Sequence, residues 1–170
     1  VVPLYDTLGA EAVAYIVNQA DIELALVDTR DRMNLLLDNK QNTPKLRLIV
    51  TADGATEEDF VKAKKVGIEI MRFREIEKLG RENPLPLQPA KAEDIAVVCY
   101  TSGTTGKPKG VMISHSNFIA TIGAIQLQLG SLNLSPKDIL ISYLPLAHMY
   151  ERICEGYLFV NGGQVGFYRG

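Results

Sequence analysis

The sequence predicts an α/β fold in which βαβ units pack in layers and the sheets are mostly parallel. Short apolar runs alternate along the chain with segments whose apolar residues recur at helical spacing. This repeated order of strand, helix and strand is typical of parallel βαβ units. The length of 170 residues, with 46% hydrophobic and 22% charged residues, suits a soluble globular domain with a sizeable core.

In the first half of the chain, predicted strands alternate with helices. The spacing of Val13, Ile16, Val17 and Ala20 predicts a helix over residues 10–20. The run at Leu24–Val27 is apolar throughout, as in a buried strand. The other elements expected here are strands at Val1–Tyr5, Leu46–Val50 and Ile68–Phe73, helices at Met33–Leu37 and Glu57–Val66, and a helical turn at Ile76–Gly80.

A proline-rich stretch separates two subregions. Three prolines fall within residues 83–89, which show no periodicity and indicate an extended linker. We therefore expect a first subregion at residues 1–82, a linker at 83–93 and a second subregion at 94–170.

Beyond the linker, a long helix is predicted. Ser114 or Ser116 can cap its start and Gly130 can end it. Its expected buried face consists of Phe118, Ile119, Ile122, Ile125 and Leu129. The remaining expected elements are strands at Ile139–Tyr143 and Val165–Tyr168 and a helix at Arg152–Val160.

The most informative segment, YTSGTTGKPKGV, runs from Tyr100 to Val111 between two apolar runs. Gly103 and Gly106 allow the backbone to approach an anion closely, and hydroxyl and lysine side chains add donors and positive charge. The spacing of the two glycines differs from that of a Walker A loop. Pro108 argues against a helix directly behind the loop, so the segment predicts a phosphate-binding loop between two strands.

Composition excludes several other classes of protein. The formal net charge of −2 provides no basic field for nucleic acid, and no apolar stretch approaches the length of a membrane span. Cys99 and Cys154 lie in apolar stretches, which indicates buried reduced thiols, and their spacing alone also allows a disulfide. Because the pattern starts at Val1 and stops at Gly170 without a clear boundary, we expect a fragment of a longer polypeptide.

The segment from Tyr100 to Val111 resembles the phosphate-binding signature of the adenylate-forming superfamily, which includes acyl-CoA synthetases, luciferases and peptide-synthetase adenylation domains. Leu144–Arg152, LPLAHMYER, is similar to the next block of that family, in a form close to the long-chain fatty acyl-CoA synthetases. Val2–Gly9 and Gly166–Tyr168 resemble the same branch. The resemblance implies part of the large N-terminal domain of such an enzyme, without its C-terminal domain.

The resemblance also implies a function for the parent enzyme, a long-chain fatty acid–CoA ligase. A fatty carboxylate would attack the α-phosphate of ATP and release pyrophosphate, and the thiol of coenzyme A would then displace AMP. The implied cofactors are ATP, Mg²⁺ and coenzyme A, and the implied partner is a fatty acid rather than nucleic acid. The alternative is a non-catalytic module, derived from an adenylate-forming domain, that binds nucleotide or fatty acid.

Location is implied by the resemblance only. Long-chain members act at the cytoplasmic face of intracellular membranes, either the endoplasmic reticulum or the mitochondrial outer membrane. Their membrane association would depend on segments outside these residues, and the fragment itself is expected to be soluble.

In the family, the middle of the loop holds the β- and γ-phosphates of ATP. The residues implied as nucleotide-binding are Thr101, Ser102, Gly103, Thr104, Thr105, Gly106 and Lys109. Thr101 is also implied as a magnesium contact. Lys109 matches the family lysine and would stabilise the pyrophosphate leaving group, whereas Lys107 is expected to be solvated.

His148 follows a predicted strand and Pro145, at the end of the sheet where α/β folds hold ligands. The resemblance implies that His148 lines the acyl site as the candidate catalytic residue. Its role would be orientation and charge screening rather than general base, because a fatty carboxylate is ionised at neutral pH. The alternative is a hydrogen-bonded core histidine. His115 is expected to be structural or to support the loop.

The residues after His148 have two interpretations. Tyr150, Glu151 and Arg152 could form an aromatic gate and an ion pair near an acyl tunnel, or an exposed helix start with a solvated pair. We expect a solvated pair for Glu151 and Arg152, a gate for Tyr150, and a core position for Met149.

Overall fold

The computed structural model of the protein describes residues 1–5, 7–52, 54–101, 107–129 and 134–168. It contains two compact units, one formed by Thr7–Gln88 and the other by Val1–Asp6 together with Pro89–Gly170. Both units combine helices with short sheets, and two of the three sheets found in the described residues are parallel. The predicted α/β class is therefore confirmed.

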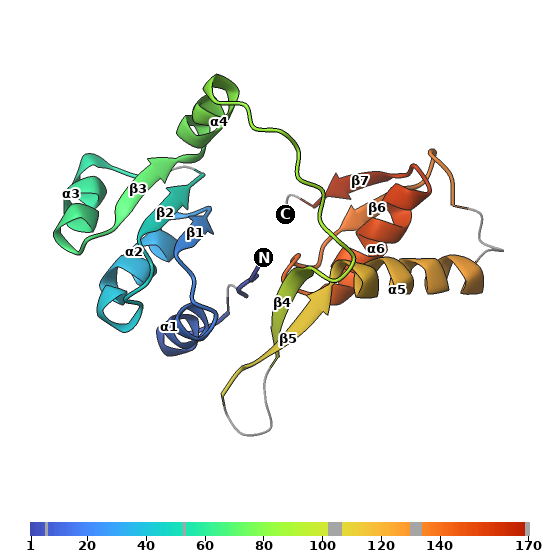
Figure 1. Cartoon of the computed structure of the whole chain (residues 1–170), viewed down its shortest axis with the longest axis horizontal. Helices are drawn as coiled ribbons and strands as arrows, with labels where there is room; N and C mark the ends of the chain where they lie inside the picture. Colours follow the sequence, from blue (N-terminus) through green and yellow to red (C-terminus); the bar gives the residue numbers. More distant parts are fainter. Residues whose placement is uncertain (6, 53, 102–106, 130–133, 169–170) are drawn as a thin grey trace. The chain divides into compact units, whose positions relative to one another are not determined.

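The unit formed by Thr7–Gln88 is a three-stranded parallel sheet with the order β1-β2-β3 (Figure 1). Its elements are α1 (Ala10–Gln19), β1 (Leu24–Val27), α2 (Arg30–Asp38), the 3-10 turn η1 (Lys40–Asn42), β2 (Leu48–Thr51), α3 (Glu57–Lys65), β3 (Glu69–Arg72) and α4 (Phe73–Glu82). The predicted order of elements is confirmed, and α2 and α4 are longer than predicted. The added residues are polar except for Phe73 of α4, and Thr29 caps α2 by accepting a hydrogen bond from the Arg32 amide.

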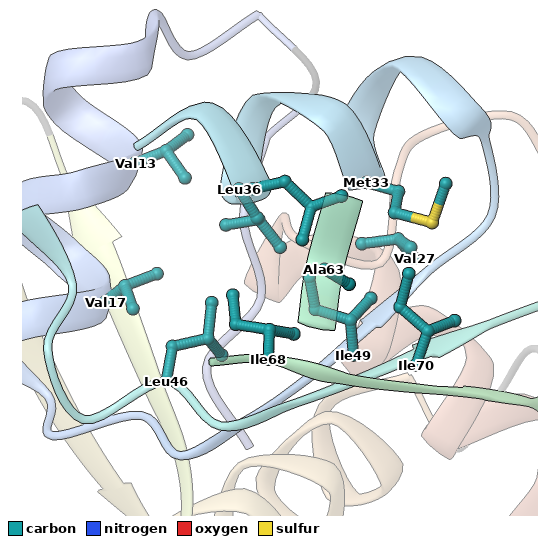
Figure 2. Packing of buried hydrophobic residues seen from close by; sticks show 11 residues of the cluster. Val13, Val17, Val27, Met33, Leu36, Leu46, Ile49, Ala63, Ile68 and Ile70 are labelled. Atoms are coloured by element: carbon teal, nitrogen blue, oxygen red, sulfur yellow. The ribbon is translucent and has the colours of Figure 1, made fainter. Parts of the chain in front are cut away.

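The core of this unit lies between the helices and one face of the sheet (Figure 2). Met33, Leu46 and Ile49 are completely buried there. The predicted apolar face of α1 is confirmed, since Val13 and Val17 belong to the same core. The remaining buried members are Val27, Leu36, Leu37, Ala63, Ile68 and Ile70.

Strand β1 is less buried than predicted. Leu24 and Leu26 are 53% and 61% exposed, and only Val27 is buried within the strand. Alternate residues of a strand point to opposite faces, so Leu24 and Leu26 share the face away from Val27 and the core. Their apolar character alone could not reveal that these two side chains are exposed.

A charged network joins the starts of α2 and α3. The Arg30 guanidinium donates to both carboxylate oxygens of Asp59, with Nε–Oδ2 and Nη2–Oδ1 distances of 2.8 and 3.0 Å. Asp59 also accepts hydrogen bonds from the amide and hydroxyl of Thr56, both at 2.8 Å. These bonds lower the pKa of Asp59 from 3.8 to about 2, the hydrogen bond from Arg30 being the largest cause.

We expect Asp59→Asn to destabilise this unit by about 1–2 kcal/mol at neutral pH. The loss arises because the carboxylate is buried, and the partial exposure of Arg30 limits it because solvent screens the pair. The Asp59 pKa is lower in the folded state, so its contribution is complete above pH 3.8 and disappears as the pH falls towards about 2. Denaturant unfolding across this pH range is the measurement. Asp28→Asn is the matched control, because Asp28 forms a more exposed pair with Arg32. Equal losses in the two variants would contradict the prediction.

The second unit contains a hairpin and a two-stranded parallel sheet (Figure 1). Its elements are β4 (Ile95–Thr101), β5 (Lys109–Ser114), α5 (His115–Gln128), β6 (Ile139–Ser142), α6 (Met149–Val160) and β7 (Gln164–Phe167). Strands β4 and β5 are antiparallel, whereas β6 and β7 are parallel. Helix α6 begins earlier than predicted, at Met149.

The predicted strand at Val1–Tyr5 is not a regular strand. The Val1 amino group donates to the Ala96 carbonyl at 3.0 Å, and the Val98 amide donates to the Val1 carbonyl at 2.9 Å. Burial raises the pKa of the Tyr5 hydroxyl, and the nearby Cys99 adds to this effect. The first residues therefore lie beside β4 without forming a ladder of their own.

Helix α5 starts as predicted, since Ser114 and Asn117 exchange two hydrogen bonds of 3.1 Å. Its predicted apolar face is largely wrong, because Ile122 alone among the five proposed residues is buried. Phe118 and Ile125 are partly buried, and Ile119 and Leu129 are exposed. Gly130, the predicted end of this helix, lies outside the described residues.

The reason is a narrow contact between α5 and α6. A Cβ atom at Gly156 of α6 would lie 2.6 Å from Ile122 Cδ1 and 3.0 Å from Phe118 Cζ. The missing side chain thus lets the two helices approach closely along one line. Apolar residues to either side of this line stay outside the contact.

Candidate functional site

The two ends of the predicted phosphate loop are held by the β4–β5 hairpin. Thr101 at the end of β4 pairs with Lys109 at the start of β5, and both residues are exposed. The predicted order of strand, loop and strand is confirmed. The hairpin therefore presents a hydroxyl and an ammonium group at the two ends of the loop. The predicted phosphate ligands outside the described residues are Ser102, Gly103, Thr104, Thr105 and Gly106.

Close packing in the hairpin next to the predicted loop depends on a glycine. Gly110 lies opposite Tyr100 in the hairpin, and a Cβ atom there would lie 3.0 Å from Val98 Cγ1 and 3.1 Å from Tyr100 Cζ. Tyr100 is buried beside this glycine, although it lies near the end of β4, where the predicted loop begins. Gly110 thus supports the hairpin that positions the loop.

A buried contact joins the hairpin to the segment that contains His148. The Cys99 thiol donates to the Ala147 carbonyl at an S–O distance of 3.6 Å, and both residues are 7% exposed. Cys99 precedes Thr101 by two positions, and Ala147 immediately precedes His148. The fold therefore joins the strand that leads into the predicted phosphate loop to the segment that contains the candidate acyl-site histidine.

His148 is the N-cap of α6, and its side chain is exposed. Its Nδ1 atom accepts a hydrogen bond from the Tyr150 amide at 3.2 Å, and its own amide donates to the Pro145 carbonyl at 2.8 Å. The alternative of a core histidine is therefore wrong. The expected position after the carboxyl end of a strand, here β6, is confirmed.

The solvated ion pair predicted for Glu151 and Arg152 is wrong. Glu151 is 2% exposed, and within the described residues its Oε1 atom has no hydrogen-bond partner. Arg152 Nε instead donates to the Leu146 carbonyl, one turn before the start of α6. Glu151 is buried by the packing around the start of α6, and the pattern of charges along the sequence does not predict that packing.

Three other side chains have less direct places in the site. Tyr150 is 60% exposed, and its hydrogen bond with Cys154 raises the pKa of its hydroxyl. Met149 is partly buried rather than a core residue. His115 is exposed at the start of α5, and its amide donates to the Asp94 carbonyl at 3.0 Å. The gate predicted for Tyr150 stays a prediction.

Sequence reasoning missed two residues that position the site, Cys99 and Arg152. The apolar stretch around Cys99 correctly predicted that this thiol is buried, but it did not predict what the thiol contacts. Its partner Ala147 is distant in sequence, and no local pattern indicates that contact. Both cysteines are free, so no disulfide joins them.

The described residues show neither a metal cluster nor a membrane helix. No group of three or more His, Cys, Asp or Glu side chains in the described part of the chain could hold a metal ion. Within that same part, every helix is too short or too polar to traverse a bilayer.

Comparison with known proteins identifies the family. The family model described as AMP-binding enzyme matches residues 1–170. Long-chain-fatty-acid–CoA ligase 5 of Rattus norvegicus is 42% identical over 172 residues, covering 99% of this chain and 25% of the ligase. Long-chain-fatty-acid–CoA ligase 1 of Homo sapiens is 42% identical over 173 residues, covering 100% of this chain and 25% of the ligase.

Solved structures of adenylation domains have the same fold. The adenylation domain of a carboxylate reductase from Mycobacterium chelonae superposes with a TM-score of 0.80 at 20% identity, covering 99% of this chain and 27% of that domain. A didomain of the carboxylic acid reductase from Segniliparus rugosus, solved in complex with AMP, has a TM-score of 0.73 at 22% identity. It covers 99% of this chain and 25% of the didomain.

The chain thus spans about a quarter of the length of the curated ligases that it matches. The family match extends over all of its residues, and the hairpin, the loop and the capped histidine lie within the matched region. The chain belongs to the family of AMP-binding enzymes, and its curated relatives include long-chain fatty acid–CoA ligases.

Proposed function

We propose that this chain is part of a long-chain fatty acid–CoA ligase, in which it contributes the pyrophosphate loop and part of the acyl pocket. The observation that most strongly supports this is 42% identity to such ligases across essentially the whole chain. The Cys99–Ala147 contact supports the assignment of both roles to one site, because it joins the loop segment to the segment that contains His148. Phosphate ligands would come from one segment and an acyl-site residue from the other.

The proposed reaction has two steps. The fatty carboxylate attacks the α-phosphate of ATP, the bond to pyrophosphate breaks, and the acyl-adenylate forms. The thiol of coenzyme A then displaces AMP. Positioning and charge stabilisation would supply most of the rate. Ser102, Gly103, Thr104, Thr105 and Gly106 would hold the pyrophosphate portion.

The residues at the two loop ends have distinct proposed roles. Lys109 would supply a point charge to the departing pyrophosphate, from an exposed position at the start of β5. Thr101 would supply one hydroxyl oxygen. Because Mg²⁺ prefers several oxygen ligands in octahedral geometry, Thr101 alone does not make a metal site, and we assign Mg²⁺ no step of its own.

We also propose a location for the complete ligase, at the cytoplasmic face of the endoplasmic reticulum or the mitochondrial outer membrane. Cell fractionation of the complete ligase would test this location.

The complete ligase should convert palmitate, ATP and coenzyme A to palmitoyl-CoA and AMP, whereas the 170-residue chain alone should form neither product. Contacts to two phosphates in an open, wet site are screened and contribute little each. The measurement is the release of AMP and acyl-CoA from both purified proteins in the presence of Mg²⁺. A complete ligase that binds ligand without product would favour the non-catalytic alternative. Turnover by the chain alone would contradict the proposal that this chain contains only part of the active site.

A further inference from the structure

The segment that follows α4 is rich in proline and leucine and has no role in the proposed ligase chemistry. Residues 84–90 read PLPLQPA, and they form neither helix nor strand (Figure 1). All of them are exposed. Leu85 and Leu87 are 87% and 95% exposed, although leucine is among the residue types most often found buried.

Both ends of this segment are anchored by hydrogen bonds. At the end of α4, the backbone amide and the side-chain amide of Asn83 both donate to the Leu79 carbonyl, at 2.9 and 3.1 Å. After the segment, the Lys91 amide donates to Asp94 Oδ2 at 2.8 Å, and the Asp94 amide donates to the Lys91 carbonyl at 3.2 Å. Between these anchors, residues 84–90 form no hydrogen bond with another described residue. Their carbonyl groups are therefore available to a partner.

The prolines favour a polyproline II helix in this segment. Proline holds φ at about −65° and disfavours the α conformation in the residue before it. Pro84, Pro86 and Pro89 restrict almost every residue of the segment in one of these two ways. A polyproline II helix has no internal hydrogen bonds and exposes its backbone, which agrees with the bonding found here. Because the segment is restricted before binding, a partner loses little conformational entropy when it binds the segment.

The positions of the prolines match a period of three. A polyproline II helix has about three residues per turn, so residues three positions apart share an edge. Pro86 and Pro89 share one edge. Leu85, Gln88 and Lys91 share the adjacent edge. Two X–Pro dipeptides, 85–86 and 88–89, thus lie on the same side one turn apart, and a lysine follows the second of them by two positions.

We infer that residues 84–91 are a docking segment for a protein domain of the SH3 type, which recognises polyproline II helices in a groove lined by aromatic side chains. Each X–Pro dipeptide would occupy one pocket of that groove. The ammonium group of Lys91 would meet an acidic side chain beside the groove. Lys91 is exposed, and its backbone amide, rather than its side chain, binds Asp94. The inference goes beyond the proposed function and does not depend on catalysis.

An array of purified SH3 and WW domains, probed with the 170-residue chain, tests the inference. We expect at least one SH3 domain to bind, and titration calorimetry then gives its affinity for variants of the chain. Replacing Pro86 and Pro89 together with alanine should weaken this binding at least about tenfold, because both pockets lose their proline ring. Lys91→Glu should also weaken it at least about tenfold, because a like charge would then face the acidic side chain.

The third edge of the polyproline II helix provides matched controls. Pro84 and Leu87 lie on that edge and would face away from the groove, so Pro84→Ala and Leu87→Ala should change the affinity less than about twofold. Lys137→Glu makes the same charge change at another exposed lysine and should also have little effect. Circular dichroism of every variant should match that of the unmodified chain, because the replaced side chains are exposed.

Four results would overturn the inference. They are the absence of binding by every SH3 domain of the array, binding by WW domains alone, an equal loss for the Pro84 variant and the double proline variant, and an equal loss for Lys137→Glu and Lys91→Glu. The complete ligase should bind the same SH3 domain as the chain does. Failure of the ligase to bind it would also overturn the inference, because the segment would then be covered.

Discussion

Replacing Thr104 and Thr105 together with alanine should reduce pyrophosphate exchange by the complete ligase by about 10²–10³-fold. Both residues stand at the centre of the proposed loop, between Gly103 and Gly106. Their hydroxyls would donate to the β- and γ-phosphates, where negative charge increases as pyrophosphate leaves. The loss should therefore appear in adenylation much more than in fatty-acid binding.

Two measurements separate these effects. Pyrophosphate exchange reports adenylation, and equilibrium binding of a labelled fatty acid reports the acyl pocket. Thr121→Ala is a matched control, because Thr121 is an exposed residue of α5 whose hydroxyl donates to the Asn117 carbonyl of the same helix. If the double variant exchanges pyrophosphate at the unmodified rate, Thr104 and Thr105 do not belong to the phosphate site.

Replacing Ile49 with alanine should destabilise the unit of residues 7–88 by about 2–5 kcal/mol. Ile49 is completely buried in the central strand β2, and it pairs with Ala25 on one side and Ile70 on the other. Figure 2 shows its side chain within the cluster that also contains Met33 and Ala63. Alanine would leave a cavity whose walls belong to several elements and cannot all move inward.

Two further variants test this explanation by denaturant unfolding. Ile49→Val should cost only about 0.5–1.5 kcal/mol, since it removes one methylene group. Leu26→Ala removes more atoms than Ile49→Val, from the neighbouring strand β1. Because Leu26 is 61% exposed, its loss of stability should nevertheless be smaller than that of Ile49→Ala. A similar loss for Leu26→Ala and Ile49→Ala would contradict the assignment of Ile49 to the core and of Leu26 to the exposed surface.

Local patterns predicted the elements well where a helix or strand contains its own signal. The spacing of Val13, Ile16 and Val17 predicted both α1 and the side of it that is buried. Pro108 correctly predicted that no helix follows the loop, because proline lacks the amide hydrogen that a helix requires. The hydroxyl-rich loop and its family were also evident from residue types alone, since they depend on chemistry within a short segment.

Burial could not be predicted in the same way. Leu24 and Leu26 have the apolar character of core residues, but their side chains are 53% and 61% exposed. Glu151 has the character of a surface residue, yet it is buried at the start of α6. In each case exposure is determined by neighbours far along the chain, and local apolar or charged character does not identify them.

The sequence by itself determined the α/β class and most of the strands and helices, and it predicted which residues would meet a phosphate. Only the tertiary structure decided that Cys99 contacts Ala147, and thereby that Thr101 and His148 belong to neighbouring segments. It also decided that the Nδ1 atom of His148 caps α6. The physical reason is that hydrogen bonds between distant segments form only when packing brings their backbones within about 3–4 Å, and this packing depends on the whole unit.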